Sequence, residues 1–301
     1  MALVIHSPAP PATHLHRVNA ELVRLLTTSG DLFAAEMAAV PLPDSINRIA
    51  ALSGAEKARH LPIVTSIDLL PAIRRQAPDW HAYDCVNHDL KLATSLYDVA
   101  FGVLSTAGDI STPDQLRGRR IGAPPRPSSV RWLTEVLLRD GWGILDDVEL
   151  VDVMPYAVPH AIASGRIDAT TWNLVTIRPE TISSEFPELL SRPVSRWIEV
   201  DGATITKVNA ANPFKISGVT LKTGESAAKL LSFRQGLAVW TSTPDDVVNG
   251  ILETLPARGM DFAGLPRSVR EMANWPFLTK ELLHVAALDF FQRNGVEFDW
   301  G

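Results

Sequence analysis

Cysteine, long hydrophobic runs and clusters of basic residues are all scarce in this 301-residue sequence. The single cysteine, Cys85, excludes an internal disulfide framework and any zinc site built on two or more cysteines. With a net charge of −6 and no block of Lys and Arg, the chain lacks the positive surface that attracts nucleic acids or anionic membranes. No run reaches the roughly 18 consecutive apolar residues of a membrane span. We therefore expect neither nucleic-acid binding nor membrane insertion.

Several common chemical motifs are also missing. The sequence has no P-loop, no dinucleotide-binding glycine fingerprint, no nucleophile elbow and no zinc-protease motif, so we expect no cofactor and no metal. Residues 1–5 are apolar without a preceding basic residue, and a Pro-rich segment follows at 6–11, which is unlike a secretory signal. As written, the sequence predicts a cytoplasmic protein, or a periplasmic one if a leader was removed.

What is present is ordinary globular composition, 46% hydrophobic and 21% charged. At this length one core usually stops growing, so two lobes are expected. Short apolar runs alternate with turns and helical patterns, and Gly165 suits the end of a helix. Predicted strands are 3–5, 63–65, 92–104, 120–123, 148–153 and 167–172; predicted helices are 14–26, 67–73 (capped by Ser66), 112–116, 130–139, 157–164, 244–253 and 275–294.

This alternation predicts an α/β fold in which each lobe is a mainly parallel sheet flanked by helices. No Pro/Ser linker separates two autonomous domains, so the lobes should share crossover strands. We place lobe I at residues 1–103 plus 213–301 and lobe II at 104–212. Residues 181–241 show little regular patterning, and we assign no elements there.

Five segments follow one another in a characteristic order. They read LATSLY at 92–97, ISTPDQLRGRRIG at 110–122, PSSVR at 127–131, ASGRIDA at 163–169 and LHVAALDFFQRNGV at 283–296. This series resembles the type II periplasmic solute-binding fold, and in particular the TAXI-type receptors of tripartite TRAP transporters. Those receptors carry an "LY" strand, "DLkGKrv", a "GSGT" turn, "GkiDA" and a closing helix near "HpGAirYYkekGv".

The resemblance implies a ligand cleft between two lobes, hinge closure and, for an exported protein, docking on a membrane permease. Two segments depart from the pattern. Residues 127–130 read PSSV in place of GSGT, and residues 8–13 read PAPPAT where the first loop is usually rich in Gly and Tyr. These departures point to a different ligand or to a site reshaped for other work.

Three candidate ligand-binding residues lie at the start of the helix expected at 130–139. Ser128 and Ser129 precede it, and free N–H groups and the helix dipole favour an anion at such a position. Arg131 lies in the first turn and could clamp a carboxylate with two hydrogen bonds. The alternatives are a plain N-cap for the serines and an exposed, solvated arginine.

Further candidates lie at the strand-to-helix turns of lobe I. Ser7 and Thr13 flank the first loop, and Thr65 and Ser66 end the second predicted strand. A hydroxyl there can donate to a ligand oxygen or merely cap a helix. His14 also flanks the first loop and is a candidate ligand contact, whereas metal binding by His14 and its neighbours is not expected.

The remaining candidates lie on predicted strands. Trp172 and Asn173 could supply an aromatic wall and an orienting amide, although Trp172 could equally fill the core. Tyr97 could point into the cleft or into the hinge. Asp168 is expected to brace a strand end, and Cys85 to be a small buried hydrophobe and not a nucleophile.

These residues support two hypotheses of different classes. The first is a solute-binding protein that closes around a small organic anion, a carboxylate with an apolar or aromatic part. The alternative is a cytosolic enzyme on the same scaffold, with decarboxylase, lyase or isomerase chemistry on a small carboxylic acid. A cytosolic ligand sensor or carrier would share the chemistry of the first hypothesis.

Overall fold

The computed structural model describes residues 2–11, 13–28, 34–40, 42–74, 86–176, 182–183, 189, 192–223, 226–258, 265–276 and 278–298, so Cys85 lies outside the described residues. The chain divides into two compact units. Unit 1 comprises Met1–Tyr97 and Arg234–Gly301, and unit 2 comprises Asp98–Phe233. The lobe limits expected from the sequence, 103/104 and 212/213, fall on other residues and stay predictions.

Unit 1 is built on the strands β1 (Ala2–Ser7), β2 (Ala34–Ala39), β3 (His60–Thr65), β4 (Leu90–Ser105) and β11 (Ser226–Trp240). They are arranged in the order β2-β1-β3-β11-β4. β1 is parallel to β2 and to β3, whereas β11 runs antiparallel to β3. Two of these strands, β4 and β11, continue into unit 2.

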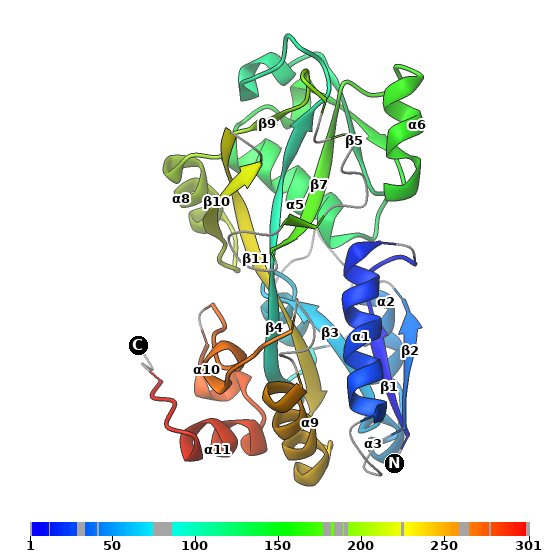
Figure 1. Ribbon diagram of the computed structural model, residues 1–301, viewed down its shortest axis with the longest axis vertical. Helices are drawn as coiled ribbons and strands as arrows, with labels where there is room; N and C mark the ends of the chain where they lie inside the picture. Colours follow the sequence, from blue (N-terminus) through cyan, green and yellow to red (C-terminus); the bar gives the residue numbers. More distant parts are fainter. Residues whose placement is uncertain are drawn as a thin grey trace. The chain divides into compact units, whose positions relative to one another are not determined.

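The helices of unit 1 pack on this sheet. In Figure 1, α1 (His14–Thr28, blue) lies beside β1 and β2, against which it packs, and α2 (Leu42–Ala50) packs on β1 and β3. The apolar spacing of α1 buries Val18, Leu22, Leu25 and Leu26, together with one polar residue, Asn19. The other helices are α3 (Gly54–Lys57), α4 (Leu69–Arg74), α9 (Asp245–Arg258), α10 (Val269–Met272), η6 (Lys280–Leu282) and α11 (Val285–Arg293).

Unit 2 contains the strand order β4-β7-β5-β6. β5 (Arg120–Ala123) is parallel to β6 (Glu149–Asp152) and to β7 (Ala169–Thr176), while β4 is antiparallel to β7. Short strands β8 (Ile182–Ser183), β9 (Arg196–Ile198) and β10 (Ser217–Thr223) pair with β7, β4 and β11. The helices are η1 (Pro113–Leu116), α5 (Ser129–Val136), η2 (Leu137–Gly141), η3 (Leu145–Asp147), η4 (Pro155–Ala157), α6 (Val158–Ala163) and α8 (Gly202–Ala211).

The α/β fold expected from the sequence is confirmed, with helices flanking mixed sheets. Most of the antiparallel pairs involve β4 or β11, and the strand–helix pattern did not predict these pairings. The helix expected at 275–294 is wrong over its first half, because α11 begins only after His284, whose Nδ1 accepts a hydrogen bond from the Ala286 N–H at 3.3 Å. Gly165 has the expected positive φ, 66°, after α6. Among the described residues, no helix combines the length and the apolar character that crossing a membrane requires.

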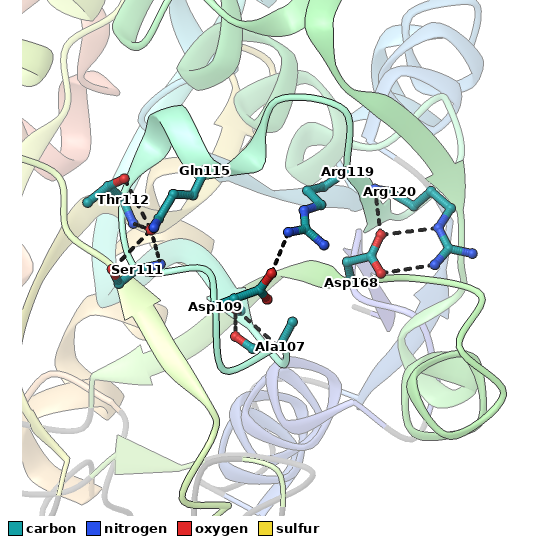
Figure 2. A network of polar contacts seen from close by, with 9 residues as sticks. Ala107, Asp109, Ser111, Thr112, Gln115, Arg119, Arg120 and Asp168 are labelled. Carbon is teal, nitrogen blue, oxygen red and sulfur yellow. Dashed lines mark hydrogen bonds and ion pairs between the residues drawn. The ribbon is translucent and has the colours of Figure 1, made fainter.

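Asp168 braces the start of β7, as expected from the sequence. Its carboxylate accepts hydrogen bonds from the Arg120 backbone N–H at 2.9 Å and from the guanidinium at 2.9 and 3.1 Å, which join the first residues of β5 and β7 (Figure 2). The hydrogen bonds from Arg120 hold the pKa of Asp168 below its usual value. Figure 2 also shows the ion pair between Arg119 and Asp109, which is more exposed.

Replacing Asp168 with Asn should therefore destabilise the protein. We expect Asp168→Asn to lower the free energy of unfolding by about 1 kcal/mol, a value reduced because the Arg120 side chain is 40% exposed. Asp109→Asn, which breaks the more exposed ion pair, should cost less than about 0.5 kcal/mol. Urea unfolding of both variants measures the difference, and equal costs would show that the hydrogen bonds to Asp168 add nothing beyond a surface ion pair.

Candidate functional site

A buried chain of polar side chains lies in unit 1 where β1 ends. The Asn19 amide N–H donates to Ser7 Oγ at 2.9 Å, and the Tyr97 hydroxyl lies 2.6 Å from Asn19 Oδ1 and 2.5 Å from Gln235 Oε1. All four side chains are buried. They come from β1, α1, β4 and β11, and we call them the strand-end cluster. The predicted site residues Ser7 and Tyr97 are thus brought together by two residues that the sequence did not single out.

Tyr97 is the centre of the strand-end cluster. Burial raises the pKa of its hydroxyl, so the group stays protonated and acts as a donor. Its one proton can be donated to only one of the two amide groups at a time, those of Asn19 and Gln235. The cluster is therefore uncharged, and its hydrogen bonds join the end of β1 to α1, β4 and β11.

The first loop is shaped by Ser7 and Thr13. Ser7 Oγ accepts from the Ala9 N–H at 3.3 Å. The Thr13 hydroxyl donates to the Pro10 carbonyl at 2.7 Å and accepts from the His16 N–H at 3.2 Å, which caps α1. Ser7 is fully buried and Thr13 is 8% exposed, so both hydroxyls are engaged within the protein. The next residue, His14, is half-buried at the first position of α1.

The second turn of unit 1 follows β3. The Thr65 hydroxyl donates to Asp68 Oδ2 at 2.5 Å and accepts from the Asp68 N–H at 3.1 Å. Ser66 Oγ accepts from the Arg234 N–H at 3.0 Å. The prediction that Ser66 caps a helix at 67–73 is wrong: α4 starts at Leu69, and Ser66 instead extends the pairing of β3 with β11.

The predicted anion site of unit 2 lies at the start of α5. Ser128 is the N-cap residue, but its side chain makes no capping hydrogen bond, and Ser129 is the first helical residue. Arg131 is engaged by carboxylates, with Nε 2.8 Å from Glu135 Oε1 and one terminal nitrogen 2.5 Å from Asp152 Oδ1. These two carboxylates already neutralise the guanidinium charge of Arg131. The side chain is therefore not free to clamp a ligand carboxylate.

Trp172 and Asn173 point to opposite faces of β7. Trp172 is 6% exposed and belongs to an apolar cluster of unit 2 that includes Ala100, Leu174 and Leu230. The structure thus places its ring in the core. Asn173 is half-buried, and its Oδ1 is buried with no hydrogen-bond partner in the part of the chain that the structure describes.

Sequence reasoning missed Asn19, Gln235, Glu135 and Asp152. Asn19 offered a signal, because it interrupts the apolar stripe of α1 beside Val18 and Leu22. Glu135 offered one as well, because it follows Arg131 by four residues on the same helix. Gln235 and Asp152 offered none, since their roles depend on contacts between separate segments. Across the described ranges, no group of three or more His, Cys, Asp or Glu side chains could hold a metal ion.

Comparison with known proteins now places the fold. Residues 90–196 match the family model described as NMT1/THI5 like. A search of curated protein sequences finds no match. Similar solved structures include a periplasmic transporter protein (14% identity, TM-score 0.56, covering 97% of this chain and 92% of that one). Another is MatC from Rhodopseudomonas palustris with bound malate (10% identity, TM-score 0.56, covering 97% of this chain and 95% of that one). A third is Rpa4515 from R. palustris with adipate (13% identity, TM-score 0.53, covering 85% of this chain and 82% of that one).

At these identities the likeness concerns the fold. The chain has the α/β fold of the periplasmic binding proteins, of type II, with mixed sheets flanked by helices.

Proposed function

We propose that this protein binds a small organic anion as a solute-binding protein. The observation that carries the proposal is the start of α5. There the N-cap residue Ser128 has a side chain that makes no capping bond, close to the carboxyl end of β5 in sequence and structure. Backbone N–H groups and the positive end of the helix dipole favour a carboxylate at such a position.

Two relatives in fold support the chemical class. MatC is described with bound malate and Rpa4515 with adipate, and both ligands are carboxylates. In unit 1, the strand-end cluster consists of neutral side chains that already bond to one another. The predicted contacts Ser7, Thr13, Thr65, Ser66 and Tyr97 would act chiefly by shaping this region, because each already has an internal partner.

The finer assignments also belong to this proposal. The motif order from 92 to 169 supports a receptor of the TAXI type, with an interlobe cleft, hinge closure and a permease partner for an exported protein. We also propose a cytoplasmic location, or a periplasmic one for an exported form of the protein.

Thermal unfolding against a panel of mono- and dicarboxylic acids tests the proposal directly. A ligand present at about 100 times its dissociation constant should stabilise the protein by roughly 2.7 kcal/mol. Mass spectrometry of each mixture then shows whether the acid is unchanged. A stabilising acid that is recovered intact supports a binding protein, a consumed acid identifies an enzyme, and no response from any acid overturns the proposal.

The start of α5 provides a sharper test. The double variant Ser128→Leu/Ser129→Leu should weaken binding of the best acid by at least about 100-fold, because two bulky apolar side chains would cover the N–H groups of the first turn. Calorimetric titration measures the loss. Thr112→Leu, at the start of the short helix η1, is the matched control and should leave the affinity unchanged. Undiminished binding by the double variant would place the anion elsewhere.

A further inference from the structure

The outer edge of the sheet in unit 1 is formed by β2, which among the described strands pairs with β1 alone (Figure 1). The Val40 N–H donates to the Ser7 carbonyl at 3.1 Å, so the backbone of Val40 faces β1. The backbone groups of successive residues in a strand point alternately to its two sides. Ala35, Met37 and Ala39 therefore direct their N–H and C=O groups away from β1.

Thr27, near the end of α1, supports this orientation independently. Its hydroxyl accepts from the Ala35 N–H at 3.3 Å and can donate to the Ala35 carbonyl at 3.2 Å, so it caps both outward groups of Ala35. The same hydroxyl lies 2.9 Å from the Val23 carbonyl oxygen, which is an alternative acceptor within α1. Within the described ranges, the outward backbone groups of Met37 and Ala39 have no hydrogen-bond partner.

β2 lacks most of the features that keep an edge strand from pairing with another chain. Its sequence, AAEMAA, contains no proline and no lysine, and Glu36 is its only charged residue. All six residues stay in register with β1, so no bulge twists this edge away from a partner. The alanines present little side-chain bulk to an approaching backbone. The edge of β2 is therefore able to accept a further strand.

We propose that β2 pairs with β2 of a second copy of this protein, in antiparallel orientation about Met37, and that the two copies form a two-fold symmetric dimer. In this register Met37 faces Met37 of the second copy, and each donates its N–H to the carbonyl of the other. Ala35 of each copy then faces Ala39 of the other. Glu36 faces Ala38 of the second copy, so the single charge of β2 does not lie directly opposite an equal charge.

A second copy fits this edge better than an unrelated strand because the outward residues of β2 are centred on one position. Such a strand is complementary to itself, and two opposed residues of an antiparallel pair exchange the same hydrogen bonds. The pair at Met37 forms without competition. The pairs between Ala35 and Ala39 require the Thr27 hydroxyl to leave Ala35 for the Val23 carbonyl. We therefore expect a weak, reversible dimer whose affinity Thr27 limits.

Sedimentation equilibrium of the full chain tests this proposal. The wild type should show a dimer fraction that rises between about 5 and 500 µM protein, as for a small interface. Met37→Pro removes an N–H that the fold does not use and should weaken the dimer at least about tenfold, because proline is tolerated at a strand edge only where its nitrogen faces outward. Met37→Leu keeps the N–H and is the matched control, with an affinity within about twofold of the wild type.

Thr27→Val gives a result in the opposite direction. This variant removes the hydroxyl that competes for the outward groups of Ala35, so the dimer should tighten by at least about threefold. Thr27 is exposed at the end of α1, and circular dichroism should show an unchanged fold. A dimer that is no tighter than that of the wild type would contradict the role given to Thr27 and the register with it.

Cross-linking decides the register even if Met37→Pro does not fold. Opposed residues of a hydrogen-bonded antiparallel pair have Cα atoms about 5.5 Å apart, a separation that suits a disulfide. In a Cys85→Ser background, Met37→Cys should therefore form a disulfide-linked dimer with oxidised glutathione, which accepts the two electrons. Ala34→Cys, also exposed on β2 but opposite Val40 of the second copy, should not.

These outcomes do not depend on the proposed binding of an organic anion. A wild-type protein that stays monomeric up to about 500 µM overturns the proposal. A folded Met37→Pro variant with undiminished dimerisation, or cross-linking at Ala34 in place of Met37, would show that the copies associate through another surface or register, and the proposal would be wrong.

Discussion

Gly236→Ala should lower the free energy of unfolding by about 3 kcal/mol, among the largest effects of any single added methyl group in this protein. A Cβ at this position would lie 2.6 Å from the Trp275 ring, 2.8 Å from Leu92 Cδ1 and 2.8 Å from the Thr94 carbonyl oxygen. The backbone oxygen cannot rotate away, and both side chains are buried. The cost therefore arises from overpacking between β11 and β4, not from a special backbone conformation.

Guanidinium-induced unfolding at constant pH measures this effect. Gly54→Ala is the control, because no atom lies within 4 Å of a Cβ built on Gly54, at the start of α3. Its stability should match that of the wild type within about 0.5 kcal/mol. A cost below 1 kcal/mol for Gly236→Ala would mean that β11 and β4 can separate locally without loss of packing.

The sequence predicted the elements whose pattern is local. The apolar run at 92–104 identified β4 to within two residues at each end, and the strand at 120–123 matches β5. The long strand β11 was missed, although its unit 1 part is almost wholly buried. A strand buried on both faces shows no alternation of polar and apolar residues, so periodicity could not reveal it.

The candidate site shows the same division between local and long-range information. Ser7 and Tyr97 were identified as polar residues at strand ends, but their partners could not be found from sequence neighbours. Tyr97 and Gln235 are 138 residues apart in the chain. Arg131 was expected to meet a ligand carboxylate, yet the protein supplies Asp152, 21 residues away, in addition to Glu135 on the next helical turn. Only the tertiary fold decides which acid reaches a given arginine.

Trp172 illustrates a choice that the sequence left open. A tryptophan next to an asparagine at the end of a strand fits a ligand wall and a core residue equally well. The structure buries the indole of Trp172 among apolar side chains of unit 2, while Asn173 points to the other face of β7. Aromatic content alone therefore gave no reliable indication of the ligand's apolar part.

Acidification should destabilise the protein through His6. His6 lies at the end of β1, next to Ser7, and its Nε2 is 2.8 Å from His60 Nδ1, while its own Nδ1 is buried without a partner among the described residues. Burial, the neighbouring His60 and Arg48 on α2 lower the pKa of His6 to about 4. Burial also lowers the pKa of His60, which Glu56 and Glu36 partly oppose.

The direction of this pH effect on stability follows from the number of protons that the folded and unfolded states bind. A histidine in the unfolded chain has a pKa near 6.5, so below that pH the unfolded state binds a proton that folded His6 does not accept until about pH 4. The contribution of neutral His6 is complete above about pH 7 and is lost as the pH falls from about 6.5 towards 4. At pH 5 the loss should be about 2 kcal/mol relative to pH 7.5, since each pKa unit corresponds to about 1.4 kcal/mol.

Urea unfolding of the wild type and His6→Asn at pH 7.5 and pH 5.0 separates the contribution of His6 to the free energy of unfolding from that of all other titrating groups. His6→Asn should be less stable than the wild type at pH 7.5, because the contact with His60 is weakened. The gap should close by about 2 kcal/mol at pH 5.0, where only the wild type must keep a buried imidazole uncharged. A gap that stays constant between the two pH values would show that His6 takes up its proton in the folded protein as readily as in the unfolded chain, and that the end of β1 beside Ser7 is open to water.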